Sequence, residues 1–259
     1  MLEDQVSGEN RNRSWKGVFG TAALAIAIVL LAAAAGFGAS AAFDVWSRIH
    51  EPRAFAAGEL EALITGRVAV SLFAFQIVTV VAVLFANAYK RRTTGTGFLN
   101  FAMPSGGIKT FALAIVALIS IAVCFASLVF AFDPEALRHD LQPFSEMMQS
   151  RTWWLIWLAA GVGAPLSEEL LFRGLIFGAL RRSPLGFAGA TLITSVSWAL
   201  LHANYSIYGL SAITLIGIYL AWLRERTGSL TTPIVCHGAY NSFIILLMVL
   251  TPNTTLTAG

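Results

Sequence analysis

The sequence predicts an all-α protein, a polytopic transmembrane helix bundle of seven spans. Of its 259 residues, 57% are hydrophobic and only 12% are charged, whereas about 25% of the residues in soluble domains are charged. The apolar residues are collected in long uncharged runs, several of which reach the roughly 20 residues that a helix needs to cross a bilayer. The charged residues gather mainly in the short segments between these runs.

Seven apolar runs define the expected spans. They cover residues 18–38, 68–89, 110–132, 152–180, 186–202, 210–223 and 230–250. The first run has no small-residue cleavage site after a short apolar core, so we expect it to be a retained span. Residues 43–67 are expected to form a polar connection with a short interfacial helix near 54–64, and an eighth span results if this connection inserts. Asp133-Pro134 is expected to end the third span, and an acidic loop follows to Arg151.

Four regions follow from this division. Residues 1–16 form a polar cytoplasmic tail, residues 17–151 hold three accessory spans with their loops, residues 152–250 hold a core of four helices, and residues 251–259 form a polar C-terminal tail.

The basic residues predict the orientation of the chain. With the N-terminus in the cytoplasm, 11 of the 17 Lys and Arg residues fall on the inside, five fall outside, and Arg173 lies within a span. This bias predicts a multi-pass protein of the cell (inner) membrane with a cytoplasmic N-terminus. The net charge of +3 is spread over short loops and forms no single patch, so we expect membrane lipids, and no nucleic acid, as partners. The inside residues are Arg11, Arg13, Lys16, Lys90, Arg91, Arg92, Lys109, Arg181, Arg182, Arg224 and Arg226.

A charged cluster lies in the middle of the fourth span. Glu169 and Arg173 are four residues apart, on one face of a helix, and are expected to form a structural ion pair. Glu168 is rotated by about 100° from Glu169 and has no cation nearby in the sequence. Ionisable residues inside a membrane are costly and usually functional, so Glu168 is a candidate general base or acid. The alternative is that all three side chains form one buried network that only holds helices together.

Polar side chains also interrupt the later spans. His202 ends the fifth span, and His237 and Asn241 lie on one face of the seventh. Counted from the basic ends of their spans at about 1.5 Å per residue, Glu168, His202 and His237 lie at depths of roughly 20, 24 and 16 Å. The similar depths predict one shared cavity lined by these side chains and Asn241.

These residues carry a resemblance to a known family. Three motifs follow one another on successive apolar helices: Glu168-Glu169-x-x-x-Arg173, Trp198-x-x-x-His202 and His237-x-x-x-Asn241. In this order they resemble the motifs of the CPBP family, the CAAX prenyl protease and bacteriocin-processing enzymes also called Abi. Residues 226–230 are similar to the run that precedes the third motif in that family, which usually has Phe at the position of Trp198. The resemblance covers residues 153–247.

The resemblance implies an intramembrane endopeptidase that cleaves near the C-terminus of a prenylated, CAAX-type, or other membrane-associated peptide. Glu168 would activate water with His202, while His237 and Asn241 would bind the oxyanion or complete the site. Two alternatives remain for the cofactor: the enzyme uses none, or Glu168, His202 and His237 hold a divalent metal such as zinc. Two histidines and a glutamate are a known catalytic ligand set for zinc. The chain has no His-Glu-x-x-His, Gly-x-Gly-Asp or Gly-x-Ser-x-Gly motif of other protease classes.

Two other classes of function remain open. A non-proteolytic membrane protein, such as an immunity factor or an assembly scaffold, would keep the polar core for structure alone. A transporter or proton relay would use the same residues along a pathway, but such proteins usually have two related halves, and no internal repeat is visible here.

Overall fold

The computed structural model describes Trp15 and residues 17–51 and 60–250. Apart from Trp15, the two polar tails expected at residues 1–16 and 251–259 lie outside the described residues. Within the described part the chain is built from helices and has no strand.

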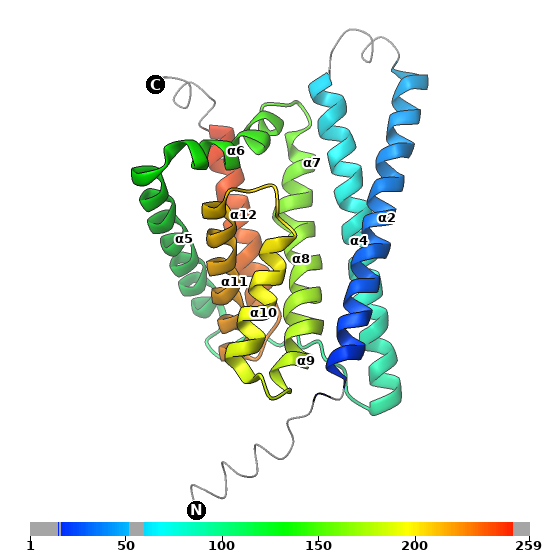
Figure 1. Ribbon diagram of the computed structural model, residues 1–259, viewed down its shortest axis with the longest axis vertical. Helices are drawn as coiled ribbons and strands as arrows, with labels where there is room; N and C mark the ends of the chain where they lie inside the picture. Colours follow the sequence, from blue (N-terminus) through cyan, green and yellow to red (C-terminus); the bar gives the residue numbers. More distant parts are fainter. Residues whose placement is uncertain (1–14, 16, 52–59, 251–259) are drawn as a thin grey trace, which may run out of the picture.

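Within residues 17–51 and 60–250, six helices are long and apolar enough to cross a membrane, which confirms the predicted transmembrane bundle. Figure 1 shows them packed side by side, with the hairpin of the first two at one edge of the bundle. They are α2 (Val18–His50), α4 (Leu60–Thr94), α5 (Gly107–Phe132), the continuous helix from Trp153 to Arg181, α11 (Ile207–Thr227) and α12 (Thr231–Leu250). The expected fifth span corresponds to α10 (Gly186–Leu200), a shorter apolar helix.

The first two helices are longer than expected. The predicted polar connection at residues 43–67 was wrong where the structure describes it, because α2 continues to His50 and α4 begins at Leu60. The polar residues of this stretch pair with each other across the hairpin. Arg67 donates from Nε to the Ser40 hydroxyl at 2.8 Å and forms an ion pair with Asp44 at 3.5 Å. The proposed interfacial helix at 54–64 lies partly at residues 52–59, outside the described residues.

The prediction of an acidic loop after Asp133 was also wrong, because residues 134–148 form helix α6 (Pro134–Met148). Asp133 ends α5 and also caps α6, since its carboxylate accepts a hydrogen bond from the Ala136 N–H at 3.1 Å. Pro134 and Glu135 suit the first turn of a helix, where the N–H groups have no partners and negative charge is favourable. Helix α6 lies across one end of the bundle (Figure 1).

The helix that carries the glutamates changes its winding twice. It consists of α7 (Trp153–Trp157), a π-helical turn (Leu158–Gly163), α8 (Ala164–Glu169), a second π-helical turn (Leu170–Ile176) and α9 (Phe177–Arg181). Such wide turns inside α-helices are frequent at functional sites. Glu168 and Glu169 are therefore held on a short α-helical stretch between two distorted ones.

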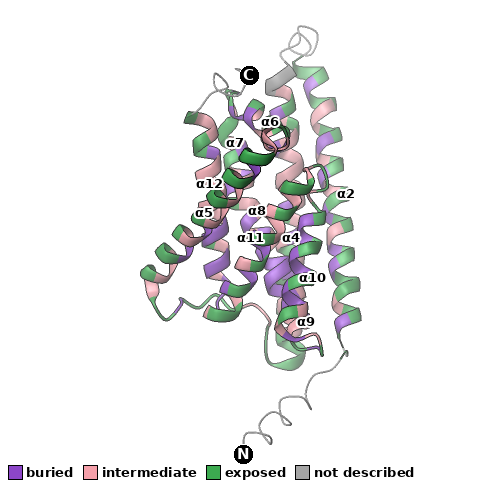
Figure 2. Ribbon diagram, turned by 60° about the vertical axis from the view of Figure 1, so that its left-hand side comes forward, coloured by how far each residue is buried: buried purple, intermediate pink, exposed green. Residues whose placement is uncertain are grey.

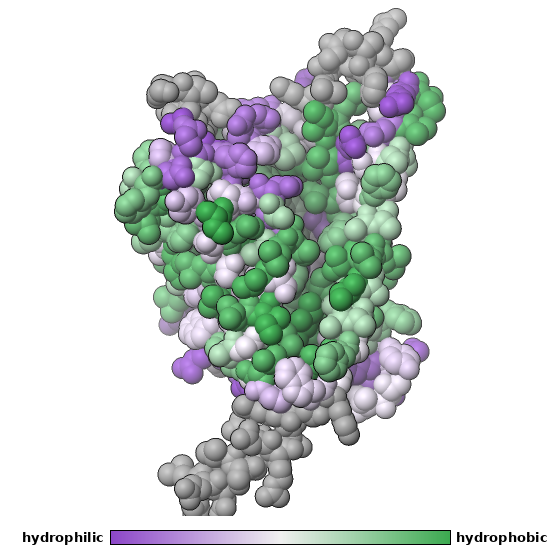
Figure 3. All heavy atoms as spheres, viewed as in Figure 1, coloured by the Kyte–Doolittle hydropathy of each residue, from purple (hydrophilic) through white to green (hydrophobic). Residues whose placement is uncertain are grey.

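The basic ends of the helices meet at one end of the bundle. The segment of residues 95–106 runs beneath the turn between α11 and α12, where Asn100 donates to the Gly228 carbonyl and accepts from the Leu230 N–H. Figure 3 shows an apolar surface over the middle of the bundle with hydrophilic residues towards its two ends. Lys90, Arg181 and Arg224 lie at the same end of the bundle, as predicted from the charge bias. That this end faces the cytoplasm stays a prediction.

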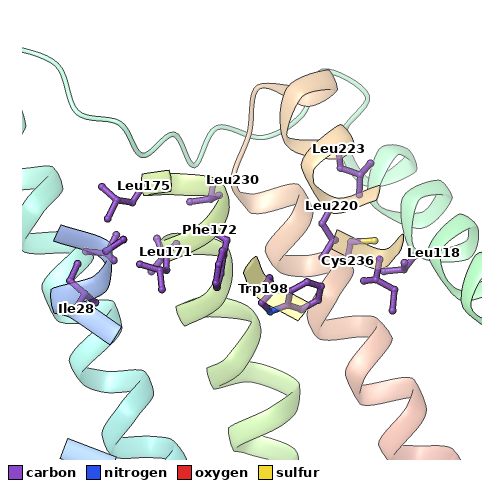
Figure 4. Packing of buried hydrophobic residues seen from close by; sticks show 14 of the residues in the cluster. Ile28, Leu118, Leu171, Phe172, Leu175, Trp198, Leu220, Leu223, Leu230 and Cys236 are labelled. Atoms are coloured by element: carbon purple, nitrogen blue, oxygen red, sulfur yellow. The ribbon is translucent and has the colours of Figure 1, made fainter. Parts of the chain in front are cut away.

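The main core surrounds the glutamate-bearing helix. Buried residues concentrate in the middle and basic half of the bundle (Figure 2). Figure 4 shows Phe172 and Trp198 at the centre of a cluster that reaches Ile28 on α2 and Leu118 on α5. The accessory and core helices thus share one hydrophobic core.

Candidate active site

Glu169 and Arg173 form a fully buried ion pair. The Arg173 guanidinium donates to Glu169 Oε1 at 2.9 Å, and both side chains have no exposed surface. Arg173 also donates to the Gly217 carbonyl at 3.0 Å and lies 4.8 Å from the centre of the Trp198 ring. The pair therefore links α8 to α10 and α11. It is the geometry that the four-residue spacing predicts.

His237 completes this buried network. Its Nδ1 lies 3.0 Å from Glu169 Oε1, and an ionised carboxylate can only accept, so Nδ1 carries the proton. The ring is then oriented by Glu169, and its Nε2 is turned to Glu168 Oε2 at 4.0 Å. That separation is too long for a direct hydrogen bond and suits a bridge through one water or substrate atom.

Glu168 differs from Glu169 in its exposure, its ion pairing and its hydrogen-bond partner. Its side chain is 20% exposed, and no ion pair with Lys or Arg joins it in the described part of the chain. Its Oε2 accepts a hydrogen bond of 2.7 Å from the indole N–H of Trp198. Glu168 is thus held in place by a neutral donor while one carboxylate oxygen also faces a histidine.

Trp198, at the position where the resembled family usually has Phe, contacts three of the candidate residues or their rings. Its ring packs edge-on against His202 and His237, with centroids 5.7 and 5.2 Å away, and its N–H binds Glu168. The sequence could have indicated this contact, because the indole N–H of Trp is a hydrogen-bond donor that Phe lacks.

His202 does not lie on the helix that was expected to carry it. Helix α10 ends at Leu200, and His202 follows in a turn, with Nδ1 3.1 Å from the Trp198 carbonyl. The ring packs against Tyr205 at 6.0 Å. Burial, and to a lesser extent the neighbouring Asp140, raises the pKa of Tyr205. His202 reaches Glu168 through the shared Trp198 ring, and no direct bond joins the two residues.

Asn241 binds the distorted helix. Its amide donates to the Ala160 carbonyl at 2.7 Å. In a π-helical turn that carbonyl would accept from the N–H five residues on, which is position 165, and Pro165 has no N–H. Gly238 allows this contact, because a Cβ there would lie 2.9 Å from the Gly161 carbonyl oxygen. Of the two amide N–H groups of Asn241, one is therefore used to hold the turn.

An accessory helix also supports the site, which the sequence analysis did not foresee. Gln76 on α4 donates to the Ala159 carbonyl at 2.9 Å, in the same π-helical turn. At the other end, Asp140 on α6 accepts from both the N–H and the hydroxyl of Ser206 at 2.6 Å. Ser206 caps α11 and follows the turn that carries His202. Nothing in the sequence around Gln76 or Asp140 indicates these partners, which are distant along the chain.

The four candidate residues are therefore brought to one region with different contacts. Glu168 and His237 face each other, His202 lies against the Trp198 that binds Glu168, and Asn241 binds the turn that precedes the glutamates.

The site was also tested as a metal centre. The two imidazoles are held through Nδ1 by a carboxylate and by a backbone carbonyl, as metal-binding histidines often are. However, among residues 17–51 and 60–250 no three His, Cys, Asp or Glu side chains gather as a ligand set. The arrangement of Glu168, His202 and His237 therefore does not fit a three-ligand metal site.

Comparison with known proteins agrees with this geometry. Residues 150–243, which contain all the candidate residues, match the family of type II CAAX prenyl endopeptidases described as Rce1-like. This segment is similar to the Rce1-like CAAX protease family over about a third of the chain. The match confirms the resemblance drawn from the three motifs.

Three curated proteins are similar to parts of this chain. "Putative membrane peptidase YdiL" of Bacillus subtilis is 34% identical over 36% of this chain and 37% of its own length. "UPF0177 protein YxdF" of Lactococcus lactis is 35% identical over 32% and 44%, and "Membrane-embedded CAAX protease MroQ" of Staphylococcus aureus is 31% identical over 34% and 37%. The chain thus matches less than half the length of each relative. No solved structure matches it.

Proposed function

We propose that the protein is an intramembrane endopeptidase that hydrolyses a peptide bond near the C-terminus of a prenylated, CAAX-type, or other membrane-associated peptide. The observation that supports this best is the asymmetry of the two adjacent glutamates. Glu169 is fully buried and neutralised by Arg173, whereas Glu168 is partly exposed, has no cationic Lys or Arg partner in the described chain, and faces His237. The match of residues 150–243 to the family of type II CAAX prenyl endopeptidases favours the same reaction class.

In this proposal Glu168 is the general base. It accepts a proton from a water molecule, and the water oxygen attacks the peptide carbonyl carbon. Glu168 then returns the proton to the nitrogen as the carbon–nitrogen bond breaks. Glu168 Oε2 and His237 Nε2 lie 4.0 Å apart, close enough for one water molecule to contact both groups.

The remaining residues position groups around this step. His202 shares the water with Glu168, using the ring nitrogen that the Trp198 carbonyl leaves unoccupied. His237, with its Nδ1–H held by Glu169, donates from Nε2 to the forming oxyanion when the ring is protonated. Asn241 completes the site with its second amide N–H and holds the π-helical turn with the first.

The test uses purified full-length protein in detergent with a fluorescent prenylated peptide ending in a CAAX sequence. We expect Glu168→Gln to abolish cleavage and leave thermal unfolding nearly unchanged, because the amide keeps the shape and the Trp198 contact but accepts no proton. The matched control is Glu135→Gln, which removes a carboxylate that is 76% exposed on α6 and should keep full activity. A parallel assay with a chelator, and a metal analysis of the protein, test whether a divalent ion takes part.

Retained cleavage in folded Glu168→Gln would contradict the proposal. If the wild-type protein cleaves neither a prenylated nor a non-prenylated peptide, the non-proteolytic immunity or scaffold function becomes the better explanation. Cleavage of both peptides at equal rates would keep the peptidase and remove the requirement for prenylation.

A further inference from the structure

A second site lies outside the candidate active site, between the accessory hairpin and the glutamate-bearing helix. A cavity of about 630 Å³ opens between the basic ends of α2, α4 and α9. Figure 1 shows these three helix ends close to one another at the end of the bundle nearest the N-terminus. The volume lies within the roughly 300–1,000 Å³ range of small-molecule sites.

Most of the cavity wall is apolar. Leu24 and Ile28 of α2 and Phe85 of α4 form one side, and Leu175 of the second π-helical turn lies on the other. A pocket with this lining, within helices that cross the membrane, is complementary to a hydrocarbon chain.

Two cations line the same cavity. Lys90 lies near the end of α4, with its Nζ 5.8 Å from the centre of the Phe98 ring, and Arg182 follows the end of α9. None of the residues lining the cavity is acidic, and in the described part of the chain neither cation forms an ion pair with a carboxylate. Among the residues that the structure describes, no carboxylate at the cavity balances these two positive charges.

We propose that this cavity binds an anionic phospholipid, with the phosphate between Lys90 and Arg182 and one acyl chain along Leu24, Ile28 and Phe85. Basic pockets between transmembrane helices at the cytoplasmic side are typical sites for anionic lipid headgroups. The charge at the end of the cavity and the apolar wall towards the membrane interior match the two parts of such a lipid. The bound lipid joins α2 and α4 to the helix that carries the glutamates, so its binding stabilises the accessory hairpin against the core.

The test measures lipid binding and thermal unfolding of the delipidated full-length protein. Phosphatidylglycerol and phosphatidylcholine with identical acyl chains are added separately to the protein in a neutral detergent. We expect phosphatidylglycerol to bind and to raise the unfolding temperature, and phosphatidylcholine to do so far less. In the double variant Lys90→Gln/Arg182→Gln, binding should be about 25-fold weaker, because each interfacial cation contributes roughly fivefold.

Two further variants separate the cavity from general charge. Arg92→Gln/Arg226→Gln removes the same charge from exposed residues of the same end that do not line the cavity, and it should bind normally. Ala86→Phe keeps both cations and fills part of the apolar wall, so it should weaken binding of the lipid.

Four results would overturn the proposal. They are equal binding of the two lipids, equal loss of binding in both charge variants, the same stabilisation by inorganic phosphate alone, and displacement of the lipid by a prenylated peptide at stoichiometric concentration. The last result would make the cavity a substrate site. The assay does not depend on catalysis, so it separates this site from the proposed peptidase activity.

Discussion

The buried Glu169–Arg173 pair allows a direct test of whether a charged residue inside this bundle depends on its ion-pair partner for stability. Glu169→Gln keeps an oxygen acceptor for Arg173 and His237 but removes the negative charge. Arg173, which has no exposed surface, then loses the carboxylate with which it pairs and remains a buried cation. Breaking a buried pair in this way costs about 3–5 kcal/mol. For a chain of this size we expect a fall in the unfolding temperature of about 6–20 °C.

A double-mutant cycle shows whether the pair itself causes this loss. Glu169→Gln/Arg173→Met removes both charges, and replacing a buried pair by apolar groups is often nearly neutral. The double variant still loses the Arg173 bond to the Gly217 carbonyl and its contact with the Trp198 ring, so recovery should be incomplete. We expect a coupling of at least about 2 kcal/mol between the two sites.

The matched control is the surface pair Arg181–Glu225. Its atoms approach to 2.8 Å, as closely as in the buried pair, but its side chains are 32% and 35% exposed. Glu225→Gln should cost less than about 1 kcal/mol. The reasoning fails if Glu169→Gln is no more destabilising than Glu225→Gln, or if the double variant loses as much stability as the sum of the single variants.

Three further predictions use the same detergent assays. Trp198→Phe should keep the fold but reduce peptide cleavage by roughly tenfold, because the Glu168 carboxylate loses a hydrogen bond worth about 1.5–3 kcal/mol; unchanged cleavage would show that the indole N–H is unimportant. Gly238→Ala should lower the unfolding temperature, since its Cβ meets the Gly161 carbonyl, while alanine at Gly20, where a Cβ meets nothing within 4 Å, should not. Asp140→Asn should destabilise the turn around His202 by about 1–3 kcal/mol, because Ser206 loses its hydrogen bonds to a charged carboxylate. Hydrogen exchange at residues 201–206 should therefore increase. Equal exchange in both proteins would show that Asp140 does not hold this turn in place.

Much of the fold could be predicted from the apolar runs, because a membrane requires long uncharged helices. The helix ends could not. Arg67 and Asp44 looked like loop residues, yet they pair across the hairpin and allow α2 and α4 to continue. Asp133-Pro134 was interpreted as a stop only, although an Asp N-cap followed by Pro is also a helix start.

The candidate site shows the same division between local and distant effects. The spacing of Glu169 and Arg173 is a property of one helix, so the sequence predicts their contact directly. The bond from Gln76 to Ala159 joins residues 83 positions apart, and no periodic pattern in α4 indicates it. His202 was expected inside a helix because the apolar run reaches it, but α10 ends two residues earlier and leaves the imidazole in a turn.

Pro165 explains why the site needs residues from so many helices. A proline within a transmembrane helix removes an N–H, and the carbonyl left without a partner must be satisfied by another group. Here Asn241 supplies that group to Ala160, and Gln76 supplies a second donor to the adjacent Ala159 carbonyl. The amides of α4 and α12 are thereby fixed against the turn that immediately precedes Glu168. The proline that leaves the Ala160 carbonyl without a backbone donor is thus also the feature that draws α12, with His237 one turn away, against the glutamates.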